Sequence, residues 1–433
     1  MLFTMTIPPP PLALVLALGV LVFLVVRRFK IHNKQAVSWN HVRDSKGKQH
    51  GLAGGSVASG SERGWPAIEP LTEFDLNTAE PGVFRPWKKV YNITMAIQTT
   101  TPSHLIAIDR NYLARVTARR QLIAAHGSAV LGLLPSPRAV QAVRDLYAYL
   151  LGYYLPRRYP SLFELVTQQG PTASDGGEKV GEELEGVVVF RNKVTGLTAP
   201  ISPLPEDPVE MLRVLGETVE DDLFLVLRDD DEFGTAVDGS HGHSHDQGHG
   251  PRPREHRAVA FVCCHPAGFN PAEKLGKRLV EIHGPVPAYE KIAASMERFF
   301  GRLEVGRPVK RVNWGIQTHS ELYSPASHAA TNTATAEMNE FSQGHLRVEL
   351  QTLTRLPTMN SDKKSSNQGS EGPILFSFKT HLYPLADIRN EGHGPALADA
   401  IEGLDSGNAP GMWAYKGAER WGRGVCEFLR GER

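Results

Sequence analysis

The chain has 433 residues, 41% of them hydrophobic and 22% charged, which is enough for one large or two medium-sized globular domains. Its 47 lysines and arginines balance its 47 aspartates and glutamates, so it has no general electrostatic attraction to nucleic acid, and we expect no such partner. Three cysteines, Cys263, Cys264 and Cys426, are too few for a disulfide framework or for a four-thiolate zinc or iron–sulfur site. This cysteine usage indicates a reducing compartment.

The N-terminus contains an apolar segment with the features of a membrane anchor. Met1–Val26 has no charged side chain and ends in a nearly continuous aliphatic run, which Arg27, Arg28 and Lys30 follow. A cleaved signal peptide would carry its positive charges before the apolar run, so the pattern predicts an uncleaved transmembrane helix over residues 1–30. By the positive-inside rule the rest of the chain faces the cytosol, and we expect the endoplasmic reticulum as the membrane.

A polar segment separates this anchor from the folded part of the chain. Residues 31–70 contain glycine, serine and lysine without periodicity and are predicted to be a flexible linker, whereas 71–433 are predicted to be one domain. After an irregular start that leads into a strand, we expect a helix over 108–125 opened by Asp109. A second helix, over 138–154, carries a tyrosine cluster that is typical of core packing or of a groove wall.

The middle of the chain alternates short apolar runs with polar segments. Val187–Phe190 and Leu223–Leu227 are predicted strands on either side of a helix over 207–219, and a polar loop covers 170–185. Residues 229–256 form a low-complexity insertion with the clustered histidines His241, His243, His245 and His249. Such a cluster can chelate zinc, nickel or copper, but no packed scaffold is evident around it, so we interpret it as a disordered surface insertion.

His283 is the histidine that local structure constrains most. A buried strand is predicted over 257–264, and Pro271 then opens a helix whose body is Glu273–Ile282 and which the Gly284–Pro285 pair ends. The imidazole is therefore presented at a helix C-terminus within a proline-constrained turn. Two interpretations remain open: a structural histidine whose protonated form the helix dipole favours, or a histidine that binds a ligand.

Two alternating runs, Leu346–Pro357 and Pro373–Leu385, are joined by the polar tract 358–372 and predict an antiparallel hairpin with a long loop. One face of the first run carries a cation, an anion and an amide in succession, namely Arg347, Glu349 and Gln351. Either this face is the wet side of a half-covered sheet, or a polar ligand or prosthetic group lies across it.

The strand predicted over 309–317 adds Arg311 and Asn313 on one parity. The other predicted elements are a helix over 289–303, a loop or loose helix over 318–344, a loop and helix over 386–405 and a closing helix over 415–431. The sequence has no Gly-rich phosphate loop, no G-x-S-x-G elbow and no H-E-x-x-H motif, so hydrolase and nucleotide-dependent functions are unsupported.

Several blocks of the sequence, in their order and spacing, resemble one protein family. EKLGKRLVEIHGPVPAY, GRPVKRVNW, LRVELQTLTRLP and ILFSFKTHLYPL resemble the haem-dependent oxidative N-demethylase alpha-subunit-like family, also called the HRQ family. Flanking blocks extend the resemblance over Phe84–Gly417. The family's E-R-Q block reads Glu349-Leu350-Gln351 here, and its proline-aromatic segment is weakly matched at His265–Phe269.

The resemblance implies an α+β fold, with a PAS-like antiparallel sheet, surrounding helices and haem b against one face. The implied site residues are His283 as the axial ligand of the haem iron, Lys274, Arg311 and Arg347 as partners of the propionates, and Glu349, Gln351 and Asn313 as catalytic residues that hold a cationic amine or order the reacting oxygen. The roles other than that of His283 follow from residue type and strand parity.

The reaction that the resemblance implies is the oxidative removal of a methyl group from a small alkylamine, with release of formaldehyde. Because this chain has no flavin or iron–sulfur signature, its electrons must come from NADPH through a separate reductase. Cys426 is rejected as a thiolate ligand, since WGRGVCEFLRG lacks the spacing of that ligand loop. Two alternatives stay open: a non-catalytic PAS-type sensor of haem or another ligand at a membrane, and a structural protein that has lost haem.

Overall fold

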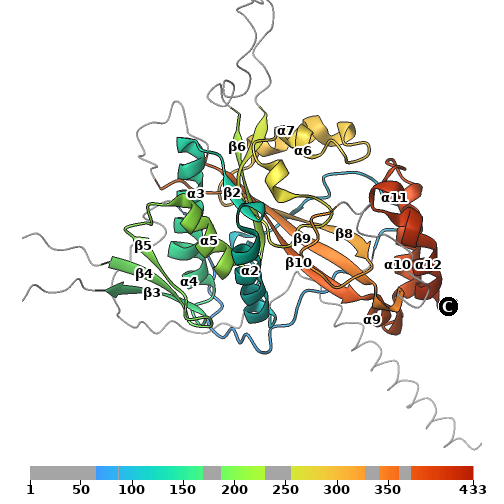
Figure 1. Cartoon of the computed structure of the whole chain (residues 1–433), viewed down its shortest axis with the longest axis horizontal. Helices are drawn as coiled ribbons and strands as arrows, with labels where there is room; N and C mark the ends of the chain where they lie inside the picture. Colours follow the sequence, from blue (N-terminus) through green and yellow to red (C-terminus); the bar gives the residue numbers. More distant parts are fainter. Residues whose placement is uncertain are drawn as a thin grey trace, which may run out of the picture. The chain divides into compact units, whose positions relative to one another are not determined.

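The computed structural model describes residues 65–85, 87–168, 187–229, 255–326, 341–359 and 372–432 (Figure 1). The predicted anchor, most of the linker and the four clustered histidines lie outside these ranges. Within them, no helix combines the length and the apolar character needed to cross a membrane. The described chain begins at Trp65, whose indole is buried against the rings of Tyr149 and Tyr153, so tertiary packing includes the end of the predicted linker.

The architecture is α+β, as predicted, and is built on one large antiparallel sheet (Figure 1). Within the described residues, seven strands pair in the order β1-β8-β9-β10-β6-β7-β2, each antiparallel to its neighbours. They are β1 (Gln98–Thr99), β2 (Leu131–Leu133), β6 (Asp222–Arg228), β7 (His256–Val262), β8 (Val309–Gln317), β9 (His345–Arg355) and β10 (Ile374–Pro384). The order places segments that are distant in sequence, such as β6 and β10, side by side.

The predicted hairpin is confirmed as β9 and β10. Gln351 lies opposite Phe378, and Glu349 lies opposite Thr380, so polar and aromatic side chains of the two strands share one face. The interpretation of this face as the wet side of the sheet is wrong, because Arg347 is only 4% exposed and Glu349 only 9% exposed. The face is covered by other parts of the chain.

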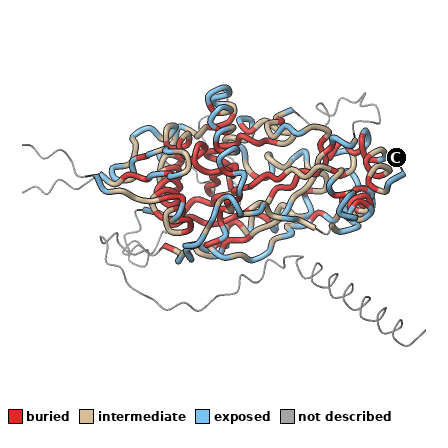
Figure 2. The backbone as a smooth tube through the Cα atoms, turned by 90° about the horizontal axis from the view of Figure 1, so that it is seen from below, coloured by how far each residue is buried: buried red, intermediate tan, exposed pale blue. Residues whose placement is uncertain are grey.

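Helices cover both faces of the large sheet. On one face α2 (Tyr112–His126), α3 (Pro137–Tyr149) and α5 (Pro208–Thr218) pack on β6 and β7, while α9 (Leu385–Asn390), α10 (Gly394–Glu402) and α12 (Ala418–Arg430) pack on β8 and β9. The opposite face, which carries Val226 and Leu353, is covered by α6 (Leu279–Ile282) and α7 (Glu290–Arg302). Figure 2 shows the buried residues running through the sheet and the helices against it.

A second sheet is smaller and is only partly anticipated by the sequence. It consists of β3 (Phe163–Gln168), β4 (Val187–Asn192) and β5 (Thr198–Ser202), of which the apolar pattern predicts only the start of β4. Phe163 and Phe190 stack with ring centroids 5.6 Å apart and are fully buried, whereas most other positions of β3 and β5 are at least partly exposed. Strands that bury so few side chains leave a weak periodic signal.

The helix predicted over 108–125 begins instead at Tyr112. Asp109 does not cap it. The Oδ1 of Asp109 accepts a hydrogen bond from the backbone N–H of Asn111, and its Oδ2 forms an ion pair with Lys379 at 2.7 Å. A tertiary partner on β10 thus takes the carboxylate that the sequence pattern assigns to the helix start.

The continuous helix predicted over 271–282 is wrong. A 3₁₀ turn, η5 (Pro271–Lys274), is separated from α6 by a further turn in which Gly276 has a φ of 79°. The backbone N–H of Gly276 donates to the carbonyl of Ala258, and the N–H of Ala258 donates to the carbonyl of Lys277. These hydrogen bonds to β7 replace helical ones, which leaves only one turn of helix before His283.

The remaining predictions that fall on described residues agree with the structure in element type, whereas the predicted loop over 170–185 and most of the segments over 318–344 and 358–372 lie outside those residues. α3 continues through a π-helical turn, η3 (Leu150–Tyr154), into α4 (Leu155–Arg158), and its tyrosines are in the core. The closing helix predicted over 415–431 is confirmed as α12, which begins only at Ala418 because Gly417 adopts a left-handed conformation with a φ of 73°. The short helix α11 (Met412–Tyr415) precedes it. Cys263, Cys264 and Cys426 are free and buried.

Candidate functional site

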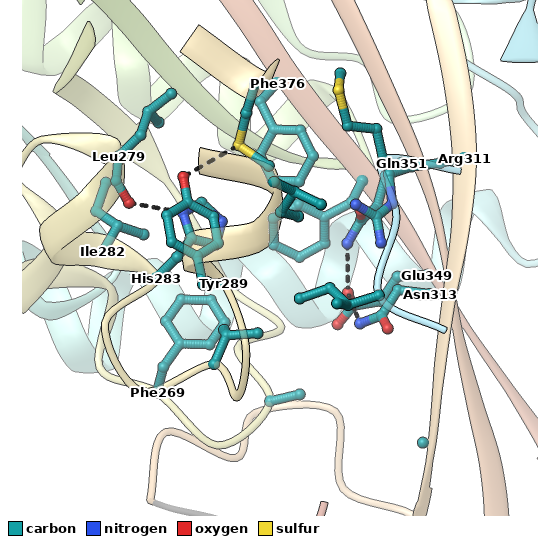
Figure 3. A pocket seen from close by; sticks show the side chains of 18 of the residues that line it. Phe269, Leu279, Ile282, His283, Tyr289, Arg311, Asn313, Glu349, Gln351 and Phe376 are labelled. Carbon is teal, nitrogen blue, oxygen red and sulfur yellow. Dashed lines mark hydrogen bonds between the residues drawn. The ribbon is translucent and has the colours of Figure 1, made fainter. Parts of the chain in front are cut away.

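A cavity of about 340 Å³ lies between the large sheet and the layer that contains α6 and α7 (Figure 3). Its apolar part is lined by Phe224, Phe376 and Phe378 of the sheet and by Met296 and Phe300 of α7. Its polar part is lined by β8 and β9, and the volume is in the range of cofactor and small-molecule sites.

The cavity brings together every site residue predicted from the sequence. Those residues are Lys274, His283, Arg311, Asn313, Arg347, Glu349 and Gln351. Figure 3 shows His283 beside Tyr289 on one wall and the polar side chains of β8 and β9 on the opposite wall. Side-chain alternation predicts the wall formed by β8 and β9, but it does not show that His283 faces that wall. The segment before α6 forms turns instead of the predicted helix, so the position of His283 depends on the tertiary structure.

His283 caps the C-terminus of α6, and its ring is held from two sides. Its Nδ1 donates a hydrogen bond to the carbonyl of Leu279 at 2.8 Å, and the imidazole stacks on Tyr289 with centroids 4.8 Å apart and planes 9° from parallel. A carbonyl can only accept, so Nδ1 carries the proton and the lone pair stays on Nε2.

Burial lowers the pKa of His283, and the Leu279 carbonyl only partly opposes this effect, while Arg311 and Lys274 lower the pKa further. The imidazole is therefore neutral at neutral pH. The interpretation of His283 as a protonated helix-terminal residue does not fit, whereas a neutral imidazole with a free Nε2 is the form that binds a metal.

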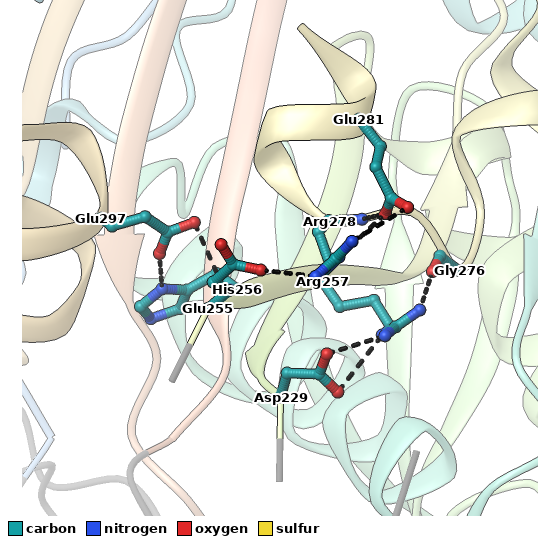
Figure 4. A network of polar contacts seen from close by, with 8 residues as sticks. All are labelled: Asp229, Glu255, His256, Arg257, Gly276, Arg278, Glu281 and Glu297. Carbon is teal, nitrogen blue, oxygen red and sulfur yellow. Dashed lines mark hydrogen bonds and ion pairs between the residues drawn. The ribbon is translucent and has the colours of Figure 1, made fainter. Parts of the chain in front are cut away.

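Ion pairs fix the turn that carries His283 (Figure 4). Arg278, at the start of α6, pairs with Glu255 at 2.9 Å and with Glu281 at 3.3 Å. Arg257 of β7 donates to the carbonyl of Gly276. These contacts tie α6 to the edge of the sheet, so the position of the imidazole is set by β7 as well as by its own short helix.

Glu349 is the acidic side chain of the cavity lining. Asn313 Nδ2 and Gln351 Nε2 both donate to its Oε2, at 3.3 Å and 2.9 Å, as Figure 3 shows. Arg347 Nε lies 3.7 Å from Oε1. The two amides therefore orient the carboxylate, and Oε1 remains the oxygen that can accept from a ligand.

Arg347 is already engaged by the protein. Its guanidinium donates to the carbonyls of His265 at 2.5 Å and Leu322 at 3.2 Å, and to Oε1 of Gln317 at 3.4 Å. The side chain thus joins β9 to the segments after β7 and β8. Its predicted use as a propionate partner competes with these structural contacts.

Arg311 and Lys274 have fewer partners. Arg311 has neither a hydrogen bond nor an ion pair with any described residue, and its Nε is buried. Burial lowers the pKa of Arg311, and the nearby Tyr91 and Glu349 partly oppose this lowering. Lys274 Nζ makes one long hydrogen bond, 3.4 Å to the carbonyl of Ile282. Both cations are free to bind an acidic group in the cavity.

The sequence interpretation missed several polar side chains of the lining, Tyr91 and Lys416 among them, and the stacking partner Tyr289. Tyr91 precedes the first strand and Lys416 lies in the gap between α11 and α12, so neither belongs to an alternating run. The aromatic lining could have been found, because Phe376 and Phe378 share one parity of the predicted hairpin.

The donor set fits a flat, apolar cofactor that carries carboxylates and a metal. The unprotonated Nε2 of His283 would coordinate the metal, the phenylalanines would pack against a hydrophobic ring, and the unpaired Arg311 would bind an acidic substituent. Within the described ranges, no three histidine, cysteine, aspartate or glutamate side chains converge on one point.

Comparison with protein-family models gives a match over residues 96–426, which is more than half of the chain. The matching model is described as haem-dependent oxidative N-demethylase, alpha subunit-like. The matched region contains all seven predicted site residues and also Lys416.

Proposed function

This chain belongs to the haem-dependent oxidative N-demethylase, alpha subunit-like family, and from that membership we propose that it oxidatively removes a methyl group from a small alkylamine. The observation that carries the proposal is the geometry of His283, whose Nδ1 is committed to the Leu279 carbonyl while Nε2 is left for a metal. A neutral imidazole held in this way is the usual proximal ligand of haem.

Haem b, when bound, supplies the oxidising chemistry at the carbon next to nitrogen. The chain would hold it through His283, with Arg311 and Lys274 on its propionates and the phenylalanines against its ring. Arg347 would act in this role only if it gave up contacts to backbone carbonyls.

Glu349 would bind the amine. An alkylamine is protonated in water, and Glu349 Oε1 can accept a hydrogen bond from its N–H while Asn313 and Gln351 hold Oε2. The carboxylate can then take the proton that the amine loses when nitrogen shares its lone pair with the oxidised carbon. The apolar side chains of α7 exclude water from the methyl group.

The remaining parts of the proposal concern the surroundings of the domain. We assign its fold to the PAS-like type, with helices around an antiparallel sheet and the ligand between that sheet and the layer of α6 and α7. The electrons come from NADPH through a separate reductase. The apolar segment over residues 1–30 anchors the chain, in the endoplasmic reticulum membrane, with the domain in the cytosol.

The test uses the purified full-length chain supplemented with haem. We expect a Soret band, which His283→Ala abolishes or shifts, while His393→Ala, at an exposed position outside the cavity lining, leaves it unchanged. With dimethylamine, NADPH and an added reductase, the wild-type protein should release formaldehyde.

The outcomes separate the alternatives. A Soret band without formaldehyde release indicates a haem-binding sensor rather than an enzyme. Folded, haem-supplemented protein without a Soret band contradicts the proposal and leaves a structural protein that has lost its cofactor.

A further inference from the structure

Lys416 is a buried lysine in the cavity lining to which neither the resemblance nor the family match gives a role. It lies directly after α11, where the left-handed Gly417 turns the chain into α12. The side chain is only 9% exposed. The helical conformation is interrupted between α11 and α12, and at this interruption the side chain of Lys416 reaches β8.

The ammonium group of Lys416 is held against β8 by Trp314. Its Nζ donates to the backbone carbonyl of Trp314 at 2.5 Å and lies 5.5 Å from the centre of the Trp314 ring and 5.9 Å from that of Tyr91. An ammonium has three N–H donors, so two remain for a ligand. The carbonyl and the rings fix the position of the charge without neutralising it.

Arg311 lies close enough to Lys416 for the two charges to interact, and neither forms an ion pair with any described residue. Burial lowers the pKa of Lys416 to about 8, with Arg311 lowering it and Glu349 raising it. The lining contains four cationic side chains, Lys274, Arg311, Arg347 and Lys416, and one carboxylate, Glu349. Four cations around a single carboxylate leave an excess of buried positive charge, which is costly unless an anionic group of a ligand completes the site.

We infer that Arg311 and Lys416 form a binding site for a carboxylate group of a ligand held in the cavity. The guanidinium offers a planar pair of donors, and the ammonium offers its two remaining N–H groups. Glu349, on the neighbouring strand β9, is positioned for a cationic group, so the cavity accommodates both charges of one ligand or of two adjacent ligands.

Two sources can provide this carboxylate. One is a propionate of haem, and the other is the carboxylate of an N-methylated amino acid whose ammonium binds Glu349. The carboxylate site is formed by side chains of this chain and does not require haem in the cavity. If the carboxylate belongs to the substrate, the inference rests on the proposed function and identifies its substrate as an N-methylated amino acid.

The experiment compares the full-length wild-type chain with Lys416→Met, Lys416→Arg and Arg311→Gln. Lys88→Met, which changes an exposed lysine outside the cavity lining, is the control. Calorimetry on haem-free protein measures the binding of N,N-dimethylglycine and of dimethylamine. Absorbance titration measures the binding of haem and of haem dimethyl ester, and the spectral change of the haem-loaded protein with each amine.

We expect Lys416→Met and Arg311→Gln each to weaken the binding of a carboxylate-bearing probe by about tenfold, as loss of one charge-assisted hydrogen bond predicts. Lys416→Arg should retain most of the affinity, and Lys88→Met all of it. If only the preference for haem over its dimethyl ester is lost, the carboxylate is a propionate. If haem binding is unchanged and only N,N-dimethylglycine binding weakens, the carboxylate belongs to the substrate.

Equal effects of Lys416→Met on carboxylate and carboxylate-free probes would overturn the inference, and so would a wild-type protein that binds neither haem nor N,N-dimethylglycine through a carboxylate. A protein that binds N,N-dimethylglycine but gives no Soret band would retain the carboxylate site while contradicting the proposed function. Circular dichroism spectra confirm that each variant is folded.

Discussion

Two buried lysines, Lys379 on β10 and Lys416 in the cavity lining, differ in what surrounds them. Lys379 of β10, 4% exposed, forms ion pairs with Glu220 at 2.6 Å and Asp109 at 2.7 Å and donates to the carbonyl of Ala107. Lys416 has a carbonyl and two aromatic rings but no carboxylate at ion-pair distance among the described residues.

The pKa values of the two lysines shift in opposite directions for this reason. Burial alone would lower the pKa of Lys379, but Glu220 and Asp109 outweigh it and raise the value. Burial lowers the pKa of Lys416 to about 8, because no comparable partner is present. A buried cation with its anions in place holds the fold together, whereas one without them indicates where a ligand binds.

The largest effect that we expect is the loss of stability when the charge of Lys379 is removed. Lys379→Met leaves the carboxylates of Asp109 and Glu220 buried and unpaired, so we expect the free energy of unfolding to fall by about 3–5 kcal/mol. Urea denaturation at pH 7 measures it. A loss below about 1 kcal/mol would show that the ion pairs of Lys379 do not stabilise the fold.

Glu349→Gln tests the cationic half of the cavity. The amide keeps the size of the side chain and the contacts with Asn313 and Gln351 but removes the charge, so we expect amine binding to weaken by about a hundredfold with little loss of stability. Titration with dimethylamine gives the affinity, and urea denaturation gives the stability. Unchanged amine affinity would contradict the role of Glu349.

The pH dependence of carboxylate binding sharpens the comparison further. Lys416 is charged below its pKa of about 8 and loses its proton as the pH rises through that value. We therefore expect N,N-dimethylglycine or haem to bind the wild-type protein about tenfold more weakly at pH 9 than at pH 7. Lys416→Arg, which stays charged, should flatten the profile. A wild-type profile as flat as that of the arginine variant would contradict the assignment.

The smallest expected effect is that of Lys416→Met on stability. The folded-state pKa of about 8 lies below the ordinary value of 10.5, so the stability linked to this group is present above pH 10.5 and is lost as the pH falls through 8. At pH 7 removal of the charge offsets the lost contacts, and we expect the variant within about 1 kcal/mol of wild type. Its stability relative to wild type should fall as the pH rises toward 10.5, as urea denaturation at several pH values can show.

Most of the fold near the site could be predicted from local patterns. β8, β9 and β10 have the period of two that a strand requires, and their polar residues share the parity that the structure shows. The helix before His283 could not be predicted correctly, because the backbone groups of Gly276 and Lys277 bond to β7 instead of to their own helix. Local helix propensity does not include hydrogen bonds to a strand that is distant in the sequence.

The amino-acid sequence by itself determined the family and the run of charged and amide side chains on β9, because motif order and side-chain alternation are properties of the chain alone. Only the tertiary structure decided that this run faces a cavity, that His283 is neutral there, and that Lys416 joins Arg311. The reason is that strand order, burial and the partners of a charge depend on segments that are far apart in the chain, which no local pattern specifies.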